Sequence, residues 1–74
     1  MGTNKMYKVE RINTETRDSE IIFIGRIRDA KKSIKTLKEE YKIRGFDTLS
    51  TGYTLLIYEK GRVLTKWIYS IEEK

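Results

Sequence analysis

Four lysines in the middle of the chain recur at the spacing of one flank of an α-helix. They are separated by four, three and four residues, and at about 100° per residue they fall within an arc of roughly 60°: Lys31, Lys35, Lys38 and Lys42, together the lysine flank. Arg26 and Arg28 precede them and extend the basic run. A row of ammonium groups can follow a phosphate backbone or meet an acidic protein surface. The same pattern also fits a solvent-exposed helix face without a partner.

A second group of residues offers aromatic chemistry near the carboxyl end of the chain. It comprises Tyr53, Tyr58, Trp67 and Tyr69. Rings on a sheet can stack nucleic-acid bases, and tyrosine and tryptophan are also common anchors of protein interfaces. Such rings equally often fill a core while their polar atoms reach water. All three roles remain open from the sequence.

The composition argues against catalysis and against metal binding. The chain contains no histidine and no cysteine, so the usual nucleophile–base pairs and a zinc site are missing. The five glycines occur singly and form no phosphate-cradling loop. Carboxylate pairs such as Glu39 and Glu40 are typical of exposed helix charges. We therefore expect a protein that is not an enzyme, with no cofactor, no metal ion and no small-molecule substrate.

The net charge of +5 is concentrated in one segment of the 74 residues. Residues 26–44 hold eight basic and three acidic side chains, so this segment accounts for the whole excess. The longest apolar run, residues 21–24, is too short to cross a bilayer, and residues 1–6 do not resemble a signal peptide. We expect a cytoplasmic protein that does not bind membranes.

The periodicity predicts two strands, one helix and two further strands. Alternation of apolar and polar residues indicates strands over 6–12, 20–28, 53–60 and 62–71. The intervening helix is expected over 30–44, with Asp29 as its N-cap and Gly45 ending it in the left-handed conformation. Its buried face is expected to consist of Ala30, Ile34, Leu37 and Tyr41, which are spaced by four, three and four residues.

These elements predict an α+β fold, a mostly antiparallel four-stranded sheet with one helix packed on one face. The chain is expected to form one domain over 1–74, with residues 1–5 and 72–74 as candidates for disorder. Residues 21–24 and 55–58 are apolar at successive positions, which indicates cover on both faces of the sheet. A helix about 10 Å wide covers only about two strands spaced 4.8 Å apart. Either the sheet curls strongly, or a second subunit, most simply in a homodimer, or a foreign partner covers the other face.

Two functions follow as expectations. The first is a small basic protein that docks an anionic partner, foremost a nucleic-acid backbone and otherwise an acidic protein surface, through Arg26, Arg28 and the lysine flank. Lysine lacks the bidentate fork with which arginine reads base edges, so backbone contacts would dominate. The alternative is a protein-binding inhibitor or adaptor that uses an exposed apolar and aromatic sheet face or an edge strand. Its candidate interface residues are the four aromatic residues named above.

Overall fold

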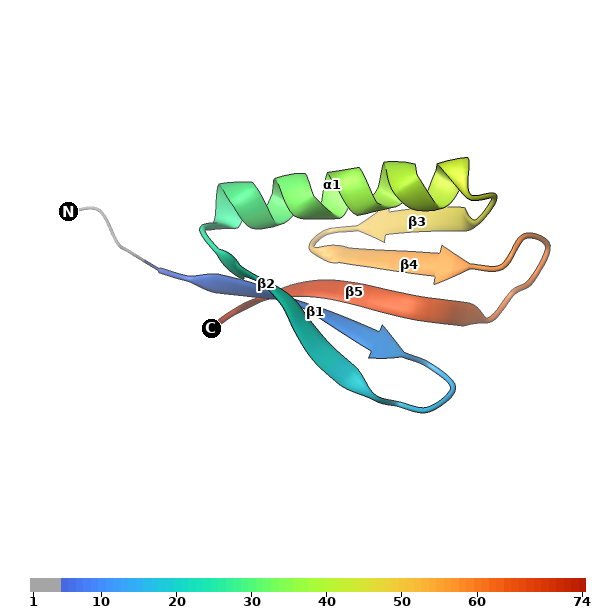
Figure 1. Cartoon of the computed structure of the whole chain (residues 1–74), viewed down its shortest axis with the longest axis horizontal. Coiled ribbons are helices and arrows are strands. Elements are labelled where there is room, and N and C mark those ends of the chain that lie inside the picture. Colours follow the sequence, from blue (N-terminus) through green and yellow to red (C-terminus); the bar gives the residue numbers. More distant parts are fainter. Residues whose placement is uncertain (1–4) are drawn as a thin grey trace.

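The computed structural model describes residues 5–74, which form five strands and one helix (Figure 1). The elements are β1 (Tyr7–Asn13), β2 (Ser19–Gly25), α1 (Ile27–Ile43), β3 (Asp47–Thr51), β4 (Thr54–Tyr58) and β5 (Thr65–Glu73). Two strands, one helix and then strands is the predicted order, but the prediction of four strands is wrong. The fifth is β3, which lies between the predicted helix and the predicted strand over 53–60 and carries only one large apolar residue, Leu49.

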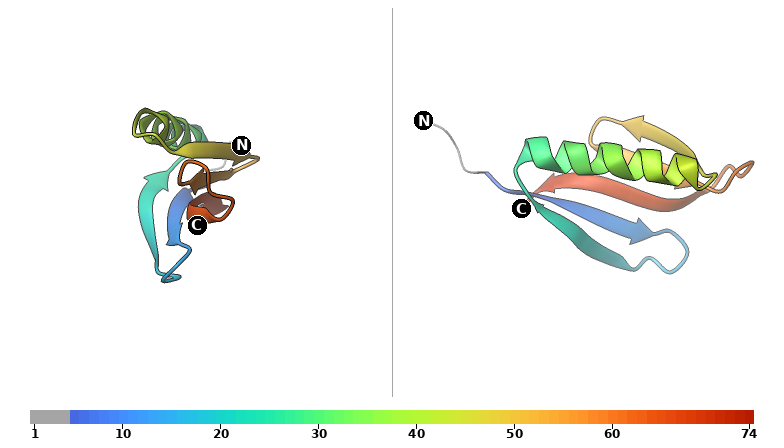
Figure 2. Two further views of the ribbon diagram at one scale, coloured as in Figure 1. Left: turned by 90° about the vertical axis from the view of Figure 1, so that its right-hand side faces the viewer. Right: turned by 45° about the horizontal axis from the view of Figure 1, so that its top comes forward.

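All strand pairs are antiparallel, and the order across the sheet is β2-β1-β5-β4-β3. Helix α1 leaves one edge strand, β2, and leads into the other, β3. The sheet curves around the core, and the helix lies over its concave side (Figure 2). Because the sheet curls, one helix can cover more of its concave side than it could cover of a flat five-stranded sheet. No helix in the part of the chain that the structure describes is long and apolar enough to cross a membrane.

Element boundaries differ from the predicted ones where an end residue lacks a sheet partner. Strand β2 stops at Gly25 because the chain turns into α1 directly after it. Strand β5 begins at Thr65, since Val63 and Leu64 lie in a loop and are 89% and 81% exposed. At the carboxyl end, for which the sequence allowed disorder, β5 continues to Glu73 and the Lys74 amide donates to the Met6 carbonyl. The corresponding prediction for residues 1–5 falls almost wholly outside the described residues.

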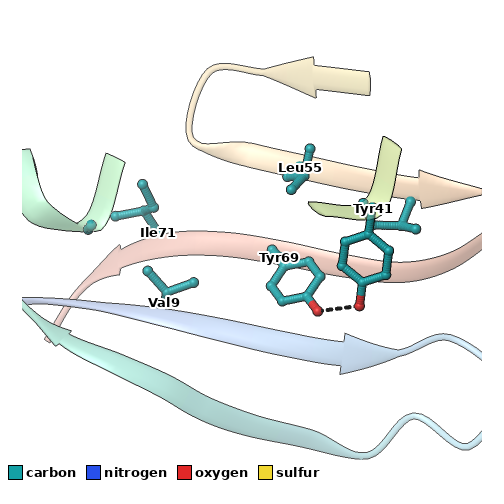
Figure 3. Close-up of a cluster of buried hydrophobic side chains, with 7 residues drawn as sticks. Val9, Tyr41, Leu55, Tyr69 and Ile71 are labelled. Carbon is teal, nitrogen blue, oxygen red and sulfur yellow. Dashed lines mark hydrogen bonds between the residues drawn. The ribbon is translucent and has the colours of Figure 1, made fainter. Parts of the chain in front are cut away.

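The core lies between α1 and the concave face of the sheet, called the inner face below. Its buried side chains come from the helix and three strands: Val9, Ala30, Tyr41, Leu55, Ile57, Tyr69 and Ile71 (Figure 3). Ile34 and Leu37 pack against this cluster and are partly buried. The predicted buried face of the helix is therefore confirmed.

The carboxyl end of α1 is closed as the sequence predicts. Gly45 has a φ of 95°, its amide donates to the Lys42 carbonyl, and the Phe46 amide donates to the Tyr41 carbonyl. These two bonds satisfy carbonyls that a helix end leaves open. The Phe46 ring packs edge-on against Tyr41 at a centroid distance of 5.3 Å.

The amino end of α1 corrects the prediction that Asp29 is the N-cap. The cap is Arg26, in extended conformation and without a side-chain cap hydrogen bond. The helix begins at Ile27, three residues before the predicted start at residue 30, because the Ile27 side chain packs against the core. Asp29 instead lies in the first turn, where its carboxylate faces the positive end of the helix dipole.

The opposite, outer face of the sheet carries an uncovered apolar row. Four adjacent strands each contribute one large aliphatic side chain to this row, and each of these residues is directly opposite the next one across the sheet: Ile12, Ile68, Leu56 and Leu49. The first three are partly buried by their neighbours and Leu49 is 48% exposed. No element within residues 5–74 packs on this row, because the only helix there lies on the inner face.

Candidate anion-binding surface

The two flanks of α1 face different strands and differ in charge. On one side, the Lys31 ammonium lies 5.1 Å from the centre of the ring of Tyr53, a residue in the turn between β3 and β4. The lysine flank therefore faces β3. On the other side, a groove of about 430 Å³ separates the helix from Phe23 of β2, and its charged lining is two carboxylates and one ammonium group, those of Asp29, Glu40 and Lys32. Helical periodicity predicts both flanks, but only the packing shows which neighbour each one has.

The basic side chains predicted to bind a partner reach solvent. Arg26, Arg28, Lys31, Lys35 and Lys42 are exposed, and Lys38 is partly buried. The lysine flank runs over 11 residues of helix, which corresponds to about 16 Å. With Arg28 the basic row extends to about 21 Å. The structure thus brings the lysines together in a continuous, accessible row.

Within residues 5–74 these cations form no ion pair. The ion pairs there join five other cations, Lys5, Lys8, Arg11, Arg62 and Lys66, to glutamates on strands and loops. The acidic residues of α1 form no ion pair either, although Glu39 lies one helical turn from Lys35 and Lys42 and offsets part of their charge. The net charge of +5 that residues 26–44 retain is available to an external anion.

Strand β3 runs beside α1 (Figure 1, Figure 2) and adds polar groups on the side of the lysine flank. It is an edge strand that pairs only with β4, so alternate backbone N–H groups point away from the sheet. Ser50, which pairs with the inner-face residue Leu55, is also exposed and offers a hydroxyl on the side of the helix. Hydroxyls and backbone N–H groups commonly bind phosphate. This contribution was not predicted, because the residues of β3 carry no clear strand pattern.

The four aromatic residues do not form one surface. Tyr53 is 50% exposed beside Lys31, whereas Tyr58 lies on the outer face and is partly buried. Trp67 is partly buried on the inner face, with the Arg11 guanidinium 5.0 Å from its ring centre. Tyr69 is 1% exposed and belongs to the core, so it offers no surface to a partner. Of the four, Tyr53 alone adjoins the lysine flank.

The Tyr69 hydroxyl forms a buried pair with a second tyrosine hydroxyl. Its hydroxyl lies 2.6 Å from that of Tyr41, which brings α1 and β5 together (Figure 3). Burial, helped by the hydrogen bond to Tyr41, raises the pKa of Tyr69 to about 12, while nearby Arg11 acts in the opposite direction. The hydroxyl therefore stays neutral at ordinary pH and serves the packing of the core.

Neither metal chemistry nor similarity to known proteins points to another site. Among the residues that the structure describes, no cluster of three or more His, Cys, Asp or Glu side chains could hold a metal ion. No protein-family model, curated protein or solved structure matches this chain. The function is therefore inferred from the geometry and charge of the surface.

Proposed function

We propose that this protein is a non-enzymatic binding module that docks on the phosphate backbone of nucleic acid through the lysine flank, Arg26 and Arg28. One observation carries the proposal: within residues 5–74, the segment with the whole net positive charge forms no ion pair, although five ion pairs form elsewhere. Its cations are also aligned and solvent-accessible. Neutralising phosphates with such cations releases condensed counterions, which favours association.

Three further features favour a nucleic-acid backbone over an acidic protein surface. The cations form a single row of about 16 Å, as a charged strand requires. The exposed Ser50 hydroxyl and an open strand edge lie beside the row. The row itself contains lysine, which neutralises phosphate without reading bases. We therefore expect little sequence preference.

The salt dependence of binding tests the proposal. If the lysine flank neutralises four duplex phosphates, log affinity falls against log salt with a slope of about −3.6. A fourfold rise in salt then weakens binding on the order of a hundredfold. Retention is measured on a DNA duplex, a single strand and heparin in parallel. If none of the three is retained at about 50 mM salt, the proposal is refuted and an acidic protein surface becomes the better candidate.

A matched pair of variants locates the binding surface. Lys35→Gln with Lys38→Gln removes two charges and should reduce the duplex slope to about −1.8. Lys60→Gln with Lys74→Gln removes the same charge from two exposed lysines outside the flank and outside any ion pair of the described chain. This control should keep the slope near −3.6. Equal losses in both variants would mean that net charge alone, without a defined site, drives binding. Thermal melts check that both variants remain folded.

The outer sheet face favours a second function, binding of a protein. Its apolar row spans four strands and no helix within residues 5–74 covers it, whereas monomeric proteins rarely leave such a contiguous patch open. The outer face is on the opposite side of the sheet from the helix, so both partners could bind at once. Sedimentation tests for a second copy: a mass near twice 8.8 kDa identifies it, and a monomer leaves either a foreign protein or a curled sheet that needs no cover.

A further inference from the structure

We infer that the lysine flank, together with Tyr53, forms a site for single-stranded nucleic acid, with an unpaired base stacked on the Tyr53 ring. This inference rests on the proposed function and specifies the form of its partner. The phosphates of the strand follow the lysines of α1, and the base next to Lys31 turns toward the ring.

Tyr53 is held at the amino-terminal end of the basic row. It follows Gly52, whose φ of 55° forms the turn between β3 and β4. The Tyr53 carbonyl accepts a hydrogen bond of 2.9 Å from the Ile71 amide, which fixes the turn against β5. The side chain is nevertheless 50% exposed. A ring on an anchored backbone loses little conformational freedom when it binds.

The contact between Lys31 and Tyr53 joins the two interactions that a single strand needs. The Lys31 ammonium lies over one face of the half-exposed ring, 5.1 Å from its centre. In the proposed complex the base stacks on the opposite face. Proteins that bind single strands combine cations that follow the backbone with aromatic rings that stack the bases.

A duplex cannot use the ring in the same way. Its bases are stacked on one another and paired, so a protein ring reaches a base face only after unpairing, which costs several kcal/mol. The lysine flank attracts phosphates of either form, whereas Tyr53 adds affinity for unpaired bases alone. The structure thus predicts that one side chain separates single-strand binding from duplex binding.

The test compares Tyr53→Leu with the wild-type protein on an oligo(dT) of about 12 nucleotides and on a duplex of equal length. Tyr58→Leu, on the outer face away from α1, is the matched control. Loss of one stacked base should weaken oligo(dT) binding by about fivefold to a hundredfold. Duplex and heparin binding should change less than about twofold, because they depend on charge. Tyr58→Leu should leave all three unchanged, and Tyr53→Phe should retain oligo(dT) binding.

The salt slope distinguishes stacking from a merely supporting role of the ring. Stacking carries no charge, so Tyr53→Leu should keep the wild-type oligo(dT) slope, about −2.8 for four phosphates. If Tyr53 only positions Lys31, the slope becomes shallower by about 0.7 and duplex affinity falls as well, which overturns the inference. An unchanged oligo(dT) affinity overturns it too, while duplex binding through the lysine flank would still support the proposed function. Absence of binding to all three polyanions would refute both.

Discussion

The buried hydroxyl pair between Tyr41 and Tyr69 permits a sharp test of what holds α1 on the sheet. The two oxygens are 2.6 Å apart and both residues are buried, at 6% and 1% exposure. Tyr41→Phe removes one hydroxyl and deprives the buried Tyr69 hydroxyl of this partner, which leaves the Arg11 guanidinium as its polar neighbour. A buried polar group that loses its partner costs about 1–3 kcal/mol. For a chain of this length, with an expected stability of about 4–11 kcal/mol, this loss is substantial.

The double variant separates the hydrogen bond from the packing of the rings. Tyr69→Phe alone should also cost about 1–3 kcal/mol, but replacing both residues leaves two rings of nearly unchanged shape and no orphaned hydroxyl. The double variant should therefore be no less stable than the worse single variant. Urea unfolding measures the differences, and with an m-value of about 1 kcal/mol/M each single change lowers the midpoint by about 1–3 M. If the double variant loses the sum of the two single effects, the hydroxyls are not coupled and the reasoning fails.

The same pair predicts a loss of stability at high pH. The pKa of Tyr69 rises from about 10 in the unfolded chain to about 12 in the fold, so the fold favours the neutral hydroxyl. The resulting contribution, at most about 3 kcal/mol, is fully present below pH 10 and is lost as pH rises from about 10 to 12. Because lysines titrate in the same range, the measurement is the difference between wild type and Tyr69→Phe. That difference should diminish over this window, and a constant difference would contradict the assignment.

Three further predictions concern the helix and the outer face. Leu37→Ala should destabilise the fold by about 2 kcal/mol. This is the lower end of the range for a core leucine, because the side chain also borders the groove toward β2. An unchanged thermal melt would show that this face of the helix is not packed. Gly45→Ala should cost about 1–2 kcal/mol in chemical denaturation from backbone strain alone, since φ is 95° and no atom lies within 4 Å of the added carbon; a neutral effect would argue against the left-handed cap. At tens of micromolar, self-association through the outer face should appear as a dimer in sedimentation and be abolished by Ile68→Lys, and a dimer that persists in this variant would place the interface elsewhere.

The sequence alone determined the helix and the chemistry of its surface. Ala30 and Tyr41, with two apolar residues between them, recur at helical spacing and therefore lie on one face of the helix. The lysine flank is aligned by the same helical spacing. Gly45 ends the helix because its missing side chain permits a conformation that other residues adopt at a cost. These features depend on residues within a few positions of one another. Local periodicity is therefore enough to predict them.

Only the tertiary structure decided what each surface faces. A shift of register between β1 and β2 places Ile21 opposite Glu10 and Ile24 opposite Lys8, so both isoleucines lie on the outer face, where strict alternation predicts opposite faces. Strand β3 exists because β4 offers it a hydrogen-bonding partner, although its own residues carry a weak strand pattern. The contact of the lysine flank with Tyr53 likewise depends on which edge strand the helix packs beside. Pairing register and packing join residues far apart in the chain, and no local spacing encodes them.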